Sequence, residues 1–316
     1  MKQKVPIIVF LMVLFLLAGC QKNESPGVNK ESKKKISIVT TLFPLYDFAR
    51  IICGDKAEIK LLLPPGVEAH SYEPKPADLI AISKADIFIY TNAVMEPWAT
   101  TLLKGVASPA LRIVDASEGA ALRKAGVADS HEEKGHDHVG AMDPHLWLDF
   151  SNARIMVDNV TNGVISKDQA NKEFYLANAQ KYKEDLQKLD NDFILGLTGC
   201  IKNTFLHGGH YAFGYLAARY GLTYRSAQAV NPDAEPTPAT IAQLLKLVKT
   251  SGIEYVYSEE LVSPRISEML ARETGVKILT LHGAHNISKD DLAGGTSFVN
   301  LMRENLKNLK TGLQCR

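Results

Sequence analysis

The sequence predicts an α/β protein with two lobes, each a parallel sheet flanked by helices, joined by one long helix. Short apolar segments rich in β-branched residues alternate with segments of helical spacing over residues 36–114 and again over 204–309. Such alternation indicates parallel sheets, because parallel strands are usually connected by helical crossovers. Residues 151–197 are almost all helix-forming and separate the two alternating halves.

The first half is expected to contain four strands and three helices. The strands are expected at residues 36–41, 59–63, 87–90 and 111–114. The helices are expected at residues 42–52, 76–84 and about 95–103. Residues 129–140 break the pattern, because they contain almost no apolar side chain, and we expect a loop there.

The middle of the chain predicts the connecting helix. Ser166 or Asp168 could cap a new helix that runs to about residue 197. A helix of about 28 residues spans roughly 40 Å at 1.5 Å per residue, which is enough to cross from one lobe to the other. We therefore expect lobes at residues 36–165 and 199–316, with residues 166–198 linking them.

The second half repeats the alternation. Strands are expected at residues 204–207, 223–227, 255–258 and 276–281, and helices at 212–220, 240–250, 264–274 and 298–309. In sheets of this kind, ligands bind in the crevice beyond the carboxyl ends of the strands. The loops that follow the strands in both halves should therefore face a shared cleft.

The first 35 residues are expected to lie outside the fold. Residues 1–19 are typical of a secretory signal. They contain two lysines, then an apolar run over residues 5–17, then small residues before Cys20. The end of this signal resembles the lipobox of bacterial lipoproteins, which implies cleavage before Cys20 and a lipid on its thiol. The alternative is an uncleaved anchor. Residues 20–35 are polar and predict a flexible tether.

Charge and cysteine content exclude some functions. The chain has 36 basic and 35 acidic residues, so no basic excess indicates a nucleic-acid partner. Beyond Cys20 the cysteines are Cys53, Cys200 and Cys315. The sequence contains no Cys-x-x-Cys motif, which argues against a cysteine zinc cluster. Cys200 and Cys315 are expected to share the second lobe, so they are the preferred disulfide pair.

Three histidines occur in the same context. His70, His145 and His210 each follow an apolar segment expected to be a strand, on a loop rich in proline or glycine. An isolated histidine is more often a structural residue than a ligand. The repetition, with all three loops expected to face the cleft, favours one metal ion between the lobes, and neutral imidazole suits zinc.

Six motifs in the sequence are similar to motifs of a known family. They are Pro65-Gly-Val-Glu-Ala-His-Ser-Tyr-Glu-Pro74, Met95-Glu-Pro-Trp-Ala99, Asp143-Pro-His-Leu-Trp-Leu-Asp149, His210-Tyr-Ala-Phe-Gly-Tyr-Leu-Ala217, Glu235-Pro-Thr-Pro238 and Gly275-Val-Lys-Ile-Leu279. In this order they resemble the solute-binding lipoproteins of zinc and manganese ABC importers, the cluster A-I group. The resemblance implies two lobes joined by a stiff helix, with metal held between them by His70, His145 and His210.

The fourth ligand is less determined. The family usually has an acidic residue or water there, whereas this chain has Leu281-His-Gly-Ala-His285 after the last strand. His282 takes the position directly after the strand and is the preferred ligand. His285 is the alternative, because it has the same place in Leu281-His-Gly-Ala-His285 as the proposed ligand His210 has in Leu206-His-Gly-Gly-His210. Water is the third possibility, and His207 is expected to end a strand without binding metal.

The donor set favours the zinc-type branch of the family, because manganese prefers harder oxygen ligands. An imidazole site does not neutralise the charge of the ion, so carboxylates should lie behind the ligands. Glu73, Asp143 and either Glu259 or Glu260 are the candidates. A separate loop carries three further histidines and resembles the metal-gathering loop of zinc-type members, although it could equally be a plain solvated loop. They are His131, His136 and His138.

The resemblance implies an extracytoplasmic lipoprotein that captures Zn²⁺ between two lobes and delivers it to the permease and ATPase of an ABC importer. Its lipid would hold it to the outer face of the cell membrane, and it would not be an enzyme. A manganese-binding member of the same family is the first alternative. A zinc-dependent hydrolase is less favoured, because the sequence has no His-Glu-x-x-His motif and no evident general base. Cell adhesion, credited to some members, has little support without a separate adhesive module.

Overall fold

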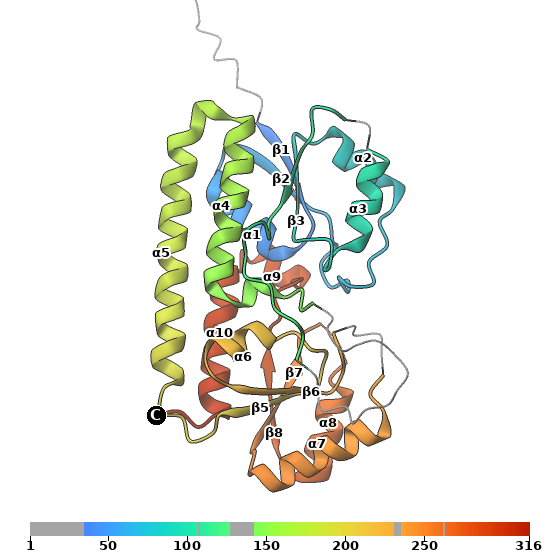
Figure 1. Cartoon of the computed structure of the whole chain (residues 1–316), viewed down its shortest axis with the longest axis vertical. Helices are drawn as coiled ribbons and strands as arrows, with labels where there is room; N and C mark the ends of the chain where they lie inside the picture. Colours follow the sequence, from blue (N-terminus) through green and yellow to red (C-terminus); the bar gives the residue numbers. More distant parts are fainter. Residues whose placement is uncertain (1–34, 107, 127–141, 231–234, 262) are drawn as a thin grey trace, which may run out of the picture. The chain divides into compact units, whose positions relative to one another are not determined.

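A computed structural model describes residues 35–106, 108–126, 142–230, 235–261 and 263–316 (Figure 1). The expected signal, Cys20 and most of the tether lie outside the described residues, as do His131, His136 and His138. The first half contains β1 (Ile36–Thr40), α1 (Phe43–Cys53), β2 (Ala57–Leu61), α2 (Pro76–Lys84), β3 (Ile87–Tyr90), α3 (Pro97–Lys104) and β4 (Arg112–Asp115).

These four strands form one parallel sheet in the order β2-β1-β3-β4. In the register, Val39 of β1 lies between Lys60 of β2 and Phe88 of β3. The inner strands β1 and β3 are largely buried, as expected of a parallel sheet covered by helices. This sheet and its helices are called the first lobe below.

One strand differs by more than one residue from its predicted range. β2 runs over Ala57–Leu61, whereas the sequence indicated residues 59–63. β2 is an edge strand that alternates half-buried and exposed side chains, so its polar first residues gave a weak signal. Leu62 and Leu63 are buried beyond the strand end, which is why they seemed to belong to it.

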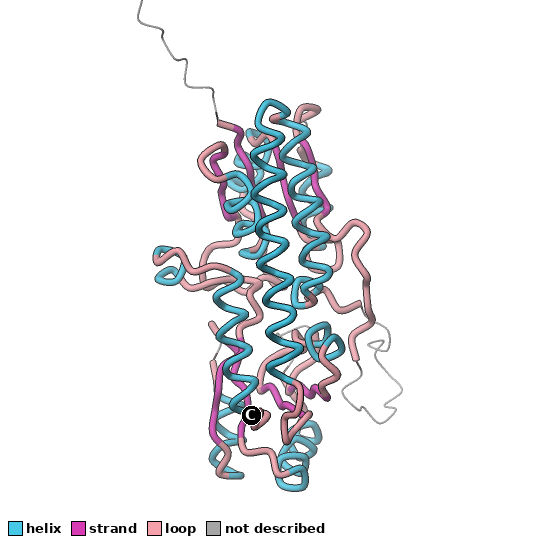
Figure 2. The backbone as a smooth tube through the Cα atoms, turned by 90° about the vertical axis from the view of Figure 1, so that its left-hand side faces the viewer, coloured by secondary structure: helices cyan, strands magenta, loops and turns pink. Residues whose placement is uncertain are grey.

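Two helices follow the first lobe. They are α4 (Phe150–Lys167), preceded by the 3-10 turn η2 (Leu146–Leu148), and α5 (Lys172–Leu197), preceded by the 3-10 turn η3 (Gln169–Asn171). The predicted break near Asp168 is confirmed. With 26 residues, α5 is about 39 Å long and packs against α1 and α4 of the first half and α10 of the second (Figure 2). It is the predicted connecting helix.

The second half forms a second parallel sheet, in the order β6-β5-β7-β8. Its elements are β5 (Thr204–His207), α6 (Gly214–Arg219), β6 (Thr223–Ser226), α7 (Pro238–Ser251), β7 (Tyr255–Glu259), α8 (Arg265–Thr274), β8 (Lys277–Leu281), α9 (Lys289–Ala293) and α10 (Phe298–Gly312). The sequence missed α9, because five mostly polar residues show no helical period. This sheet and its helices are called the second lobe.

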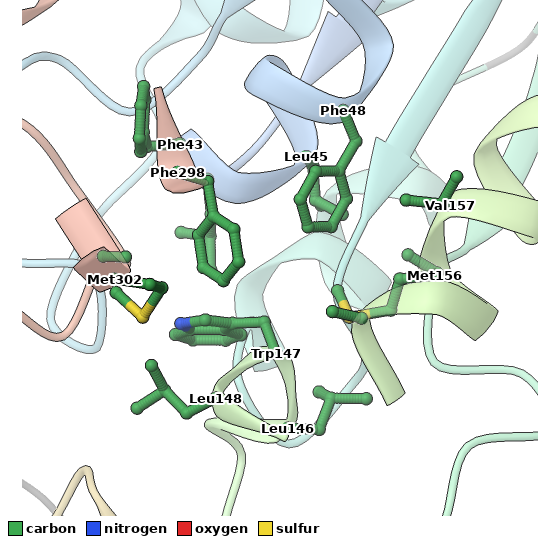
Figure 3. Packing of buried hydrophobic residues seen from close by; sticks show 14 of the residues in the cluster. Phe43, Leu45, Phe48, Leu146, Trp147, Leu148, Met156, Val157, Phe298 and Met302 are labelled. Atoms are coloured by element: carbon green, nitrogen blue, oxygen red, sulfur yellow. The ribbon is translucent and has the colours of Figure 1, made fainter. Parts of the chain in front are cut away.

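A hydrophobic cluster extends across both halves. In it, the fully buried indole of Trp147 lies between Phe298 and Leu148, with Met302 beside it (Figure 3). The ring of Phe298, at the start of α10, lies 5.5 Å from that of Phe48 in α1, in an edge-to-face arrangement. The core therefore fixes the start of α10 against the first lobe.

The far end of α10 is fixed covalently. A disulfide joins Cys200, just after α5, to Cys315, just after α10, so the predicted pair is confirmed. Cys53 is buried and free. Within the described part of the chain, every helix is too short or too polar to cross a bilayer.

Candidate metal centre

Three imidazole rings converge from separate parts of the chain. His70 lies on the long loop after β2, His145 directly before η2, and His210 on the turn after β5. The Nε2 atom of His145 lies 3.1 Å from Nε2 of His70 and 3.2 Å from Nε2 of His210. The sequence placed His145 directly after a strand, which is wrong. The residue starts a buried 3-10 turn instead, because the apolar run Leu146–Leu148 leads into α4.

Asp143 sets the orientation of His145. Its Oδ1 atom accepts a hydrogen bond from the backbone N–H of His145 at 3.0 Å and lies 2.9 Å from the ring Nδ1. Because that oxygen is an acceptor, the ring nitrogen facing it carries the proton. Nε2 of His145 is then a bare lone pair aimed at the other two rings. Burial raises the pKa of Asp143 to about 7, against the opposing hydrogen bond from His145.

Glu259, at the end of β7, contacts both the backbone and the ring of His210. Its Oε2 atom accepts the backbone N–H of His210 at 3.1 Å, and its Oε1 atom contacts the ring Nδ1 at 2.7 Å. Gly209 permits this approach, because a Cβ there would lie 2.1 Å from the carboxylate. Burial opposes the charge on Glu259, but His210 outweighs it and holds the pKa of the carboxyl well below its usual range.

The three rings differ in proton affinity. Burial lowers the pKa of His70 and of His145, and the neighbouring imidazoles lower both further. Burial also acts to lower the pKa of His210, but the Glu259 carboxylate outweighs it and the pKa is raised. Without metal, His210 is therefore the ring of the three that most readily takes up a proton.

The geometry calls for a cation at the centre of the three Nε2 atoms. The single lone pair on Nε2 of His145 cannot accept full hydrogen bonds from both His70 and His210. In a tetrahedral zinc site with Zn–N bonds of 2.0–2.1 Å, ligand nitrogens lie about 3.3–3.4 Å apart. The observed 3.1 and 3.2 Å are close to this spacing.

His285 lies beside these three rings. Its ring centre is 5.6 Å from that of His210, and it shares a second ligand cluster with His210 and Glu259. The His285 side chain is buried, and its Nδ1 atom has no hydrogen-bond partner among the described residues. Glu68 reaches both sides of the site, since it accepts the backbone N–H of His70 at 2.9 Å and lies 3.9 Å from Nε2 of His285.

The other predicted site residues lie elsewhere. His282 belongs to neither ligand cluster of the described residues. Its Nδ1 atom accepts the backbone N–H of Ala284 at 2.9 Å and lies 3.0 Å from Glu260. His207 ends β5, as expected, and is fully buried. Glu73 is exposed. The position of Glu68 between His70 and His285 could not be predicted from the sequence, because only the fold brings the loop after β2 against the segment after β8.

Two α/β lobes with four histidines gathered between them define a metal-binding protein of the solute-binding class. The family model described as "ZnuA: Zinc-uptake complex component A periplasmic" matches residues 38–312. The chain belongs to this family, whose members are zinc-uptake solute-binding proteins.

Relatives agree with this assignment. The high-affinity zinc uptake system protein ZnuA of Bacillus subtilis is 34% identical over 310 residues, 97% of each chain. The crystal structure of the Zn(II)-bound ZnuA-like domain of Streptococcus pneumoniae AdcA has 34% identity and a TM-score of 0.73, covering 89% of this chain and 99% of that one. The full-length zinc-binding lipoprotein AdcA of the same species is longer, and the chain spans 61% of it at 33% identity.

One structural neighbour bears on adhesion. The laminin-binding protein Lmb of Streptococcus agalactiae, described as a bifunctional protein with adhesin and metal-transporting activity, has 26% identity and a TM-score of 0.77. It covers 89% of this chain and 100% of that one.

Proposed function

We propose that this chain binds one Zn²⁺ through His70, His145, His210 and His285 and delivers it to the permease and ATPase of an ABC importer. The observation that carries the proposal is the convergence of three Nε2 atoms at distances close to those between the ligands of a zinc ion. A zinc ion would replace the proton that His210 holds in the metal-free site.

The choice of His285 over His282 as fourth ligand rests on what each ring contacts. His285 is buried beside His210, with an unpartnered ring nitrogen. His282 is engaged by Ala284 and Glu260, and its backbone is held by Asn305. We therefore assign His282 to anchoring the end of β8 and His285 to the metal.

The carboxylates behind the ligands support zinc as the cargo. Asp143, Glu259 and Glu68 lie at the outer side of His145, His210 and the pair His70–His285. They offset the charge of the ion while leaving four imidazole nitrogens around it, a donor set that suits zinc better than manganese. Asp143 and Glu259 each contact a histidine ring, which disfavours these two carboxylates as the general base that hydrolysis would require.

The placement of the protein in the cell follows from its first residues. We propose that cleavage before Cys20 and lipidation of its thiol anchor the chain to the outer face of the membrane, with residues 20–35 as a tether. Residues 36–165 and 199–316 would act as the metal-binding lobes, joined by residues 166–198. The loop with His131, His136 and His138 would gather zinc for the central site.

Zinc uptake tests this proposal directly. Cells that lack the protein are grown in zinc-depleted medium, with wild type, His145→Ala or Cys20→Ala supplied in turn, and zinc accumulation is measured. Wild type should restore uptake and His145→Ala should not, because it removes the central ligand. Cys20→Ala should reduce uptake by releasing the protein from the membrane. Equal uptake with wild type and His145→Ala would contradict the proposal.

A further inference from the structure

The segment that carries His285 belongs to the second half by sequence but is bound to the first lobe. Residues 283–287, here called the crossing segment, begin two residues after the end of β8. On the second-lobe side, Asn305 of α10 holds both backbone groups of His282, with Asn305 Oδ1 accepting its N–H at 2.7 Å and Asn305 Nδ2 donating to its carbonyl at 2.8 Å. The chain leaves the second lobe after this clamp.

From Gly283 onward, most polar contacts are to the first half of the chain. The indole N–H of Trp147 donates to the carbonyl of Gly283 at 2.8 Å. The N–H of Phe43, at the start of α1, donates to the carbonyl of His285 at 3.3 Å. The N–H of Gly66, on the loop that carries His70, donates to the carbonyl of Ile287 at 3.1 Å.

Asn286 makes the densest of these connections. Its side-chain amide donates to the carbonyls of Pro64 and Val67, at 2.9 and 2.5 Å, and its Oδ1 atom accepts the N–H of Ile287. The residue is 1% exposed, so each of these groups would be costly to leave unpaired. The amide thus joins the crossing segment to the loop that positions His70.

The backbone turn at Ala284 also supports the interpretation that the crossing segment is bound to the first lobe. Ala284 is fully buried and has φ of 60°, a left-handed conformation that is unfavourable for a non-glycine residue. It lies between the clamp on His282 and the bonds of His285 to the first lobe. The strained turn is held by contacts on both sides of it.

We infer that Asn286 is a positioning residue that makes His285 part of the first lobe. The inference rests on the proposed zinc site. It divides the four ligands unequally: His70, His145 and His285 stay together, and His210 alone comes from the second lobe. Separating the lobes would then break a single zinc–nitrogen bond first, leaving three ligands in place.

The test is a double-mutant cycle in zinc affinity. Asn286→Ala and His285→Ala are made singly and together in the full chain, and each Kd for Zn²⁺ is measured by competition with a chromophoric chelator. Asn286→Ala should weaken binding about 10- to 100-fold, the usual effect of losing a residue that orients a metal ligand. In the His285→Ala background the same change should have almost no effect, because the ligand that it positions is already gone.

The matched control is Asn308→Ala. Asn308 also donates its amide to a backbone carbonyl, that of Thr280 in β8 at 2.9 Å, but it is half-buried and lies outside the crossing segment. Its removal should leave the Kd unchanged. No loss with Asn286→Ala, or an equal loss in both backgrounds, would overturn the inference while leaving the zinc site intact. Absence of zinc binding by wild type would instead refute the proposed function.

Hydrogen exchange on the wild type gives a second test that needs no variant. The amides of Phe43 and Gly66 donate to the crossing segment. If this segment belongs to the first lobe, both amides should be protected to the same degree with and without Zn²⁺. Free exchange of these two amides in the metal-free protein would overturn the inference.

Discussion

Asp143 holds His145 through one oxygen atom that contacts both the backbone N–H and the ring of that residue. We expect Asp143→Asn to weaken zinc binding about 10- to 100-fold, because a neutral amide is a weaker acceptor than the carboxylate and can turn its NH2 toward the ring, so the tautomer is no longer fixed. Competition titration measures the change. Glu73→Gln is the control, since it removes the same charge from an exposed residue near His70. Equal losses in both variants would show that only net charge matters.

The raised pKa of His210 predicts the proton balance of binding. His70 and His145 have lowered pKa values and are already neutral near pH 7, whereas His210 retains a proton to higher pH. Zinc should therefore displace the proton of His210, and affinity should fall as the pH drops through the raised pKa of His210. Calorimetry in buffers of different ionisation enthalpy measures the released protons. Zinc binding without any proton release would contradict this assignment.

The same residues show what the sequence could and could not predict about the site. His70, His145 and His210 were identifiable because each lies within a motif near a proline or glycine. The choice between His282 and His285 was not, because both follow β8 within four residues. That choice depends on the left-handed turn at Ala284 and on two contacts between residues distant in sequence. Trp147 donates to Gly283, and Asn286 donates to Pro64; such contacts leave no periodic signal.

At the scale of elements, the disulfide links the ends of the two helices that connect the lobes. Cys200 follows α5, Cys315 follows α10, and the closed loop spans 115 residues. We expect Cys200→Ser with Cys315→Ser to lower the free energy of unfolding by about 2–4 kcal/mol, measured by denaturant titration. Zinc affinity should stay unchanged, because neither cysteine lies near a ligand loop. A loss of zinc binding without a loss of stability would contradict this role.

The helices and sheets were largely predictable, and the exceptions have local causes. All eight strands and the break between α4 and α5 followed from hydrophobic periodicity. β2 was displaced by two residues because it is a half-exposed edge strand, and α9 was missed because it is short and polar. β2 is held by its pairing with β1, and α9 begins at a local cap in which the Ser288 hydroxyl accepts the N–H of Asp291.

At the scale of the whole molecule, the two lobes are tied together on one side and meet at the proposed metal site on the other. α5, α10 and the disulfide connect the halves along their length. Near the site, the crossing segment adds a bridge that carries His285, the proposed fourth ligand. Capture and release of zinc should therefore need a small local movement around His210, in place of a wide opening of the lobes.

The most direct test of the central claim is a competition titration of Zn²⁺ against Mn²⁺ on wild type, His285→Ala and His282→Ala. The account predicts one tight zinc site in wild type, weak manganese binding, and a loss of zinc affinity with His285→Ala only. A preference for manganese, or a loss with His282→Ala and not with His285→Ala, would contradict the site described above.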